Sequence, residues 1–103
     1  MEKKFVSTER KGFHVTFANG LTASVQWGAG NYCDNHFPAN GDFSCTRDAK
    51  SNTAEVAVWK GEKWLNANDF VPEEKQGYDT VCGWLSPEDV VYFLCKVSEF
   101  KEV

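Results

Sequence analysis

Several features that mark common protein classes are missing from this sequence. No apolar run approaches the roughly 20 residues that a membrane-spanning helix needs, and the start of the chain, from Met1 to Phe5, lacks the apolar core of a secretion signal. The four cysteines include no Cys-x-x-Cys pair, and cysteines of a cytoplasmic protein stay reduced. We therefore expect a cytoplasmic protein that neither enters a membrane nor depends on a disulfide scaffold.

Positive charge is also scarce. The chain has two arginines, Arg10 and Arg47, and a formal net charge of −4. Residues 1–65 carry eight Lys/Arg against seven Asp/Glu, whereas residues 66–103 carry three against eight. A protein that follows a DNA duplex must neutralise many phosphates. We therefore expect no direct binding to duplex DNA, and we interpret the acidic balance as a solubilising surface.

The chain has what one small folded domain needs. With 103 residues, of which 42% are hydrophobic and 15% aromatic, it can fill a single core but has no room for a second domain. Residues 1–12 are largely polar and lack periodicity, which predicts a mobile lead-in. Residues 13–103 are expected to form a single domain.

The clearest strand pattern lies on both sides of Asn19-Gly20, where apolar and polar residues alternate. A two-residue loop would place the two apolar rows on opposite faces of the sheet. A three-residue loop over 18–20, with Gly20 in the left-handed conformation, instead pairs Phe17 with Leu21 and puts both rows on one face. The other face then presents a polar row made of His14, Thr16, Thr22, Ser24 and Gln26.

Later segments complete the fold class. Residues 53–66 alternate in the same way around the turn 60–63 and predict a second hairpin, and residues 80–85 predict another strand. Ser86 as N-cap and Pro87 at the first helical position predict a C-terminal helix. Its apolar arc is expected to cover the sheet with Val90, Val91, Phe93, Leu94, Val97 and Phe100. The predicted fold is therefore α+β, an antiparallel sheet of about four to five strands (two hairpins plus one strand) covered by a C-terminal helix.

The segment 28–52 is rich in glycine, asparagine and aspartate and predicts a long loop, a feature that is often functional. Glycines allow the backbone to approach a ligand closely, aromatic rings can stack, and amides or a guanidinium can hydrogen-bond a base or a phosphate. The same groups also suit a protein-facing surface. The candidate ligand- or partner-binding residues are Gly28, Gly30, Asn31, Tyr32, Asn35, His36 and Arg47 of this loop, with Trp64 of the second hairpin.

Cys33, His36 and Cys45 leave an enzymatic alternative open. They could hold zinc with a fourth ligand from Asp34, Asp42 or His14, and Cys33 could act as a nucleophile beside His36 or His14. Their spacing is not that of a standard zinc finger, and a domain of this size offers little depth for a cleft. We therefore expect packing roles for Cys33 and Cys45, no metal, no cofactor, and a protein that is not an enzyme.

The first hairpin and the start of the long loop contain two distinctive stretches, Gly12-Phe13-His14-Val15-Thr16-Phe17-Ala18-Asn19-Gly20 and Ser24-Val25-Gln26-Trp27-Gly28-Ala29-Gly30-Asn31-Tyr32-Cys33. These stretches resemble a segment of small uncharacterised accessory proteins encoded by tailed phages and prophages. Ala29 stands where a proline is more usual in that group, and no catalytic residue can be carried over.

The resemblance implies a phage accessory protein that acts in the host cytoplasm by binding. Such a protein would inhibit a host defence protein, as anti-CRISPR proteins do, or sequester a nucleotide immune signal. A virion accessory role, with self-association through a sheet edge, is a further alternative. The expectation from the sequence is therefore a small, acidic, non-enzymatic counter-defence factor.

Overall fold

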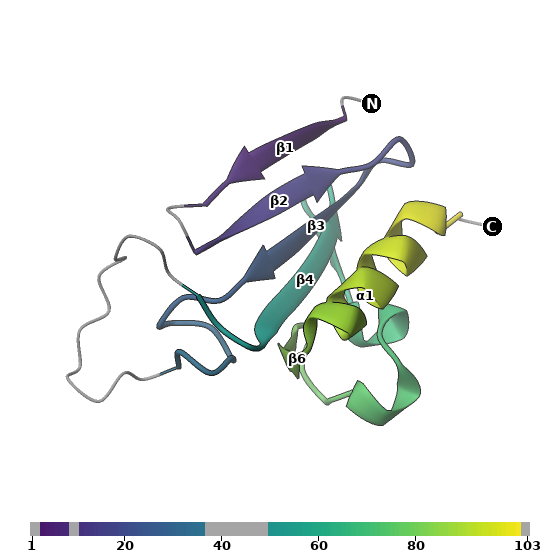
Figure 1. Ribbon diagram of the computed structural model, residues 1–103. Coiled ribbons are helices and arrows are strands. Elements are labelled where there is room, and N and C mark those ends of the chain that lie inside the picture. The colour runs from purple at the N-terminus through teal and green to yellow at the C-terminus, as the bar shows by residue number, and fades with distance from the viewer. Residues whose placement is uncertain (1–2, 9–10, 37–49, 102–103) are drawn as a thin grey trace.

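The computed structural model describes residues 3–8, 11–36 and 50–101, which form an antiparallel sheet with one α-helix packed on it (Figure 1). The predicted α+β class is confirmed, with one strand more than the sequence predicts. The strands are β1 (Lys4–Ser7), β2 (Gly12–Thr16), β3 (Leu21–Gln26), β4 (Ala54–Lys60), β5 (Lys63–Leu65) and β6 (Cys82–Leu85). Two short 3-10 helices, η1 (Ala67–Phe70) and η2 (Glu73–Lys75), precede β6, and α1 (Pro87–Glu99) follows it.

The strands lie in the order β1-β2-β3-β4-β5, and β6 pairs with β4 as well. β5 pairs with the second half of β4, from Val58 to Lys60, whereas β6 pairs with its first half, at Ala54 and Val56. β4 therefore pairs with β3 along one edge, and with β6 and β5 in turn along its other edge.

The β2–β3 hairpin has the register that the sequence predicts. Phe13 pairs with Val25, Val15 pairs with Ala23, and the Phe17 N–H donates to the Leu21 carbonyl at 2.9 Å. Gly20 has a φ of 89°, a left-handed conformation that glycine adopts without strain. Both apolar rows therefore face α1, as expected.

β1 lies within the segment that the sequence analysis predicts as a lead-in. It pairs with β2, with Phe5 opposite Val15, and all four of its residues are exposed. Phe5 itself is 80% exposed. This strand is absent from the sequence prediction because an edge strand without a buried face has no alternating pattern, and pairing with β2 determines its conformation.

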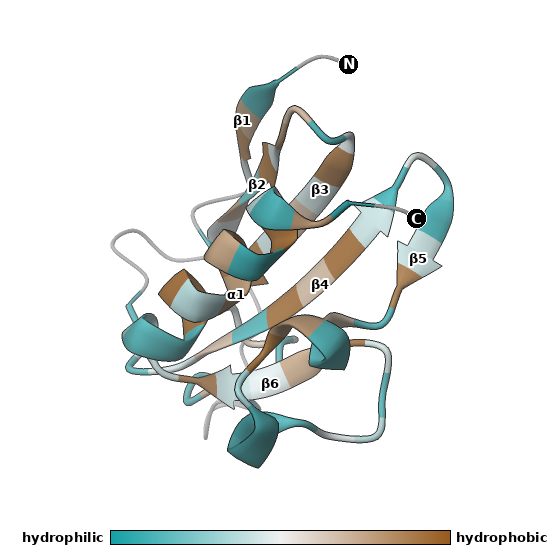
Figure 2. Ribbon diagram, turned by 90° about the vertical axis from the view of Figure 1, so that its right-hand side faces the viewer, coloured by the Kyte–Doolittle hydropathy of each residue, from teal (hydrophilic) through white to brown (hydrophobic). Residues whose placement is uncertain are grey.

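The core lies between α1 and the face of the sheet that β3, β4 and β6 present to it, where hydrophobic residues gather (Figure 2). Phe93 and Val97 of α1 are fully buried. The predicted arc is wrong at one residue, Val91, which is 67% exposed. At 3.6 residues per turn Val91 lies roughly 160° around the helix from Phe93, so it cannot share the buried face.

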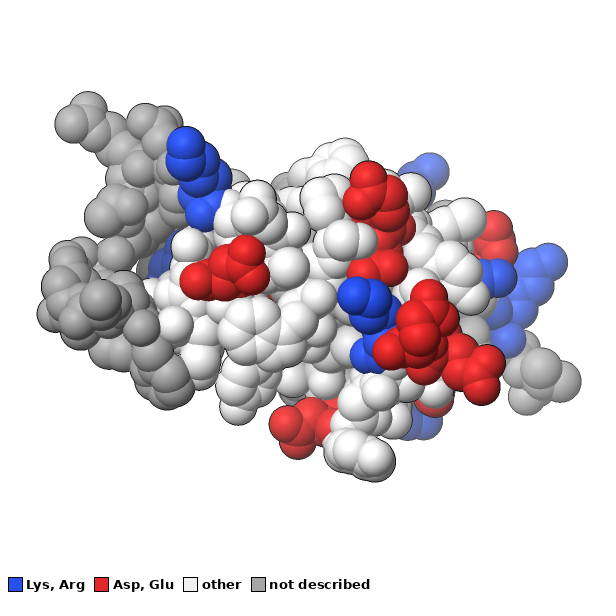
Figure 3. All heavy atoms as spheres, turned by 60° about the horizontal axis from the view of Figure 1, so that its bottom comes forward, with Lys and Arg blue, Asp and Glu red and all other residues white. Residues whose placement is uncertain are grey.

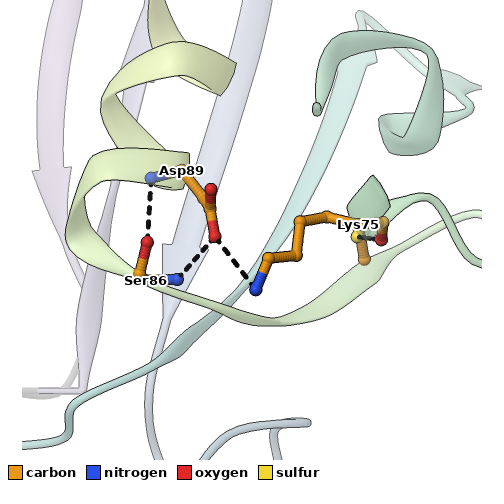
Figure 4. A network of polar contacts seen from close by, with 4 residues as sticks. Lys75, Ser86 and Asp89 are labelled. Carbon is orange, nitrogen blue, oxygen red and sulfur yellow. Dashed lines mark hydrogen bonds and ion pairs between the residues drawn. The ribbon is translucent and has the colours of Figure 1, made fainter. Parts of the chain in front are cut away.

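The start of α1 follows the predicted capping pattern. The Ser86 hydroxyl accepts a hydrogen bond from the Asp89 N–H at 3.1 Å, and the Asp89 carboxylate accepts one from the Ser86 N–H, also at 3.1 Å. The same carboxylate oxygen lies 3.5 Å from the Lys75 ammonium (Figure 4). Burial would raise the pKa of Asp89, but the hydrogen bonds from Ser86 and the Lys75 charge outweigh it and lower this pKa.

The connection between β5 and β6 contributes to the core more than its acidic sequence suggests. Phe70 and Val71 are buried, and the Phe70 ring packs against the rings of Phe93 and Phe100. The buried Asn68 side chain donates to the carbonyls of Asp79 and Val81 and accepts from a backbone N–H. These bonds hold the irregular segment against the sheet.

Charged side chains of both signs lie next to one another over the right-hand half of the face in Figure 3. The helices within the described ranges are too short or too polar to span a lipid bilayer.

Candidate binding surface

The backbone after β3 folds into a compact turn over residues 28–36. The Gly28 N–H donates to the Asn31 side-chain oxygen at 2.9 Å, and the Asn31 N–H returns a bond to the Gly28 carbonyl at 3.1 Å. Gly28 is buried, and an added Cβ there would lie 2.5 Å from the Lys11 side chain. Gly30 is exposed with open space around it, and neither glycine has a positive φ. Neither glycine therefore adopts a left-handed conformation, and the Asn31 side chain closes the turn.

The carboxylate of Glu55, on β4, anchors this turn to the sheet. It accepts hydrogen bonds from the Asn31 side chain at 3.0 Å and from the Tyr32 N–H at 3.2 Å. The Asn35 side chain donates to the Trp27 carbonyl at 2.7 Å and to the Lys50 carbonyl at 3.0 Å. Asn31 and Asn35 therefore position the turn with the amide groups that the sequence analysis assigned to a ligand.

A second anchor joins the turn to β6. The Trp84 N–H donates to the Tyr32 carbonyl at 2.9 Å. Gly83 is required here, because an added Cβ would lie 2.5 Å from the Tyr32 Cβ and 2.7 Å from its carbonyl oxygen. Both contacts are with atoms that cannot move away without displacing the backbone.

β6 is irregular at this point. Ala54 pairs with Leu85 and Val56 with Cys82, so a single β4 residue, Glu55, lies opposite both Gly83 and Trp84. This is a β-bulge, a feature that redirects side chains. Trp84 has a φ of 59°, which is rare and strained for a bulky residue.

Three aromatic rings meet where the turn touches the bulge, and we call Tyr32, His36 and Trp84 the aromatic cluster. The Tyr32 and His36 ring centroids lie 5.1 Å apart at an interplanar angle of 52°, and those of His36 and Trp84 lie 6.4 Å apart at 83°. Tyr32 is 44% exposed and Trp84 is 51% exposed. The cluster is therefore an accessible aromatic surface held by the backbone on both sides.

Tyr32 and His36 are candidates from the sequence, whereas Trp84 was missed. One signal could have identified it: Cys82 and Leu85 are both hydrophobic and three positions apart. A regular strand points residues three apart to opposite faces. Burial of both therefore requires a bulge between them, which frees Trp84 to point outward.

The chemistry of Cys33 is that of a packed thiol. Its side chain is fully buried, and its Sγ lies 3.5 Å from the Gly28 carbonyl. Burial raises the pKa of the Cys33 thiol, hydrogen bonds involving Asn35 and Ser51 oppose the rise, and the charges of Glu55 and Asp34 add to it. A protonated thiol is a poor nucleophile.

Two residues of the zinc alternative, Cys45 and Asp42, lie outside the described residues, as does the candidate binding residue Arg47. Among the described residues there is no group of three His, Cys, Asp or Glu side chains placed to hold a metal ion.

Trp64 belongs to a different part of the sheet. It pairs with Trp59, their ring centroids are 5.0 Å apart, and Trp59 makes an edge contact with His14 at 5.0 Å. Trp59 is four residues beyond Glu55 on β4, about 13 Å away at the usual rise of a strand. The structure therefore does not bring Trp64, which is 58% exposed, to the aromatic cluster.

An apolar pocket of about 400 Å³ opens on the helix side of the sheet, lined by Phe13, Trp27, Leu85, Val90 and the segment 50–54. Specific small-molecule sites combine apolar walls with a few convergent polar groups. The walls of this pocket are mostly apolar, so it does not point to a ligand chemistry.

The fold and the aromatic cluster carry no assignment from other proteins. No protein family, curated protein or solved structure matches the chain.

Proposed function

We propose that the protein is a small non-enzymatic binding protein of the phage accessory type, a counter-defence factor that engages its target through the aromatic cluster. The observation that supports this is Trp84, a large exposed aromatic residue in a strained backbone conformation beside Tyr32 and His36. Strain of this kind persists where the side chain has a use. Exposed Trp and Tyr side chains are also the residues that dominate binding energy at protein interfaces.

Two further observations support binding over catalysis. The Cys33 thiol is buried with a raised pKa, which is unfavourable for a nucleophile. The side chains of Asn31 and Asn35 are used to fix the turn. A rigid turn that presents rings at a fixed position is suited to recognition, because little entropy is lost when a partner binds.

The test is growth of defence-sensitive phages in host strains that each carry one defence system. Expression of the wild-type protein is expected to restore growth against one system, and Trp84→Ala is expected to lose that effect. Trp64→Ala is the matched control, because it also removes an exposed tryptophan, and it is expected to retain the effect. Thermal unfolding of all three proteins checks that they are folded.

Two results would overturn the proposal. If no defence system is relieved by the wild-type protein, the counter-defence role is wrong. If Trp84→Ala restores growth as well as the wild type does, the aromatic cluster is not the surface used.

A further inference from the structure

We infer that the aromatic cluster takes a positively charged side chain, arginine or lysine, of a protein partner. This inference rests on the proposed function and specifies the chemistry of its target. It favours a host protein over a nucleotide signal as the partner.

The arrangement of the rings favours a cation over a nucleobase. A nucleobase is held best between or upon parallel ring faces, because stacking needs coplanar overlap. The rings of the cluster are instead inclined at 52° and 83° to one another. Rings inclined in this way present their faces in different directions, and a compact cation needs only the face of an aromatic ring within about 6 Å.

The turn that carries Tyr32 and His36 also has negative charge. Asp34 lies between Tyr32 and His36 in the chain, and the Glu55 carboxylate is 3.2 Å from the Tyr32 N–H. Two lysines of the described residues contact the turn outside the cluster, Lys11 at Gly28 and Lys50 through its carbonyl at Asn35. The negative charges of these two residues, one within the turn and one bound to its backbone, attract a cation and repel the phosphates of a nucleotide.

The influence of these carboxylates on their surroundings supports this point. Burial is the largest cause of the raised pKa of the Cys33 thiol, and the charges of Glu55 and Asp34 add to it. Cys33 lies between Tyr32 and His36 along the chain. Both charges therefore act on the turn.

Both carboxylates are already fixed. The Asp34 carboxylate accepts a hydrogen bond from the Thr53 hydroxyl at 2.7 Å, and the Asp34 N–H donates back to the same hydroxyl at 2.9 Å. Glu55 is held by Asn31 and the Tyr32 N–H. Each oxygen keeps lone pairs for a further donor, so a guanidinium or ammonium group can bind without rearranging the site.

The direct test follows the indole and imidazole NMR signals of the full chain during titration with N-acetyl-argininamide. N-acetyl-citrullinamide is the neutral control of nearly the same shape, and a cyclic dinucleotide is the competing ligand. At constant ionic strength the Trp84 and His36 signals are expected to shift with the arginine compound, at least threefold more than with the citrulline compound. The cyclic dinucleotide is expected to leave them in place.

A charge variant makes the test sharper. Asp34→Asn removes one negative charge but keeps an oxygen that can accept from the Thr53 hydroxyl, so the turn should stay folded. It is expected to weaken argininamide binding about two- to fivefold, the range that an exposed ion pair provides. Glu62→Gln, on the β4–β5 turn, changes the net charge equally and is expected to leave binding unchanged.

The outcomes separate this inference from the proposed function. Equal shifts with both amides, or shifts with the dinucleotide instead, overturn the inference but leave a binding surface in place. If no probe shifts the cluster while Trp84→Ala still abolishes phage growth, the charge argument is wrong and the function stands. If no probe shifts the cluster and Trp84→Ala retains phage growth, both are wrong.

Discussion

At the scale of single residues, the backbone conformation of Trp84 lowers the stability of the fold while it exposes a ring for binding. A left-handed backbone costs a bulky residue about 1–3 kcal/mol, and Trp84 stays half-exposed despite that cost. The ring contact with His36 offsets only part of this conformational cost, since aromatic pairs contribute about 0.5–1.5 kcal/mol. The conformation therefore lowers stability in exchange for an outward-pointing ring.

Trp84→Gly is accordingly expected to keep or raise the free energy of unfolding, by up to about 1 kcal/mol, because glycine adopts this φ without strain. The same change is expected to abolish activity in the phage growth assay. Urea unfolding measures the first effect. Trp64→Gly, in a regular strand, is expected to lose about 1 kcal/mol instead. A clear loss of stability in Trp84→Gly would show that the ring has a packing role.

Gly83 is expected to be intolerant of any side chain. In Gly83→Ala the new Cβ would overlap the Tyr32 Cβ and carbonyl, so the turn must shift away from β6. We expect a loss of about 1–3 kcal/mol in the free energy of unfolding, together with changed NMR signals of Tyr32 and Trp84. Gly30→Ala is the matched control, because nothing lies within 4 Å of its Cβ position. Equal stability of the two variants would contradict this account of the contact.

At the scale of elements, the β2–β3 turn caps the C-terminus of α1. The Asn19 side-chain amide donates to the carbonyls of Val97 at 2.8 Å and Phe100 at 3.0 Å. Its oxygen accepts from the Leu21 N–H at 3.0 Å. Carbonyls at a helix end lack partners within the helix. Asn19 therefore stabilises the turn and the helix end at once.

Asn19→Ala is expected to lower the free energy of unfolding by about 1–3 kcal/mol, since it removes several net hydrogen bonds. Amide hydrogen exchange should increase most in the last turn of α1. Asn19→Asp keeps the acceptor for Leu21 but replaces the donor with a carboxylate that faces carbonyl oxygens. It should be at least as destabilising as the alanine variant. If it is neutral, the helix-capping bonds have little effect.

Elements with a local signal could be predicted from the sequence, and those that depend on distant pairing could not. Asn19-Gly20 determines the register of the first hairpin, and Ser86-Pro87 marks the start of α1, because each acts through neighbouring residues. β1 depends on pairing with β2, and its own side chains bury no face.

The residues of the candidate site also differ in whether the sequence predicts them. Tyr32 and His36 stand together in an unusual segment, so composition identifies them. Trp84 is 52 positions after Tyr32, and it joins them only because β6 pairs irregularly with β4 at Glu55. The spacing of Cys82 and Leu85 indicates a bulge, but no local pattern in the sequence shows that this bulge meets the turn that carries Tyr32 and His36.

At the scale of the whole molecule, stability should fall as the solution becomes acidic. Burial lowers the pKa of His14, whose ring contacts the edge of Trp59. The fold therefore favours neutral His14, and its contribution is complete above about pH 6.5, the usual histidine pKa. It is lost as the pH falls toward the lower pKa of the folded state. Urea unfolding between pH 7.5 and 5.5 is expected to show this loss, and His14→Gln should reduce it. An unchanged slope in the variant would exclude His14 as the cause.

The arrangement of core and binding surface predicts that they can be altered independently. Phe93 is fully buried and packs against Phe70, whereas Trp84 contacts His36 outside the core. Phe93→Leu is expected to lower the free energy of unfolding by about 1–2 kcal/mol, out of a total of roughly 5–15 kcal/mol for a domain of this size, so the protein stays folded and active. Trp84→Ala is expected to lose activity with little change in stability. The double variant should then show the sum of the two stability effects within about 0.5 kcal/mol, as independent sites do. A larger deviation, or loss of activity in Phe93→Leu below its unfolding temperature, would mean that the bulge transmits changes in the core to the aromatic cluster.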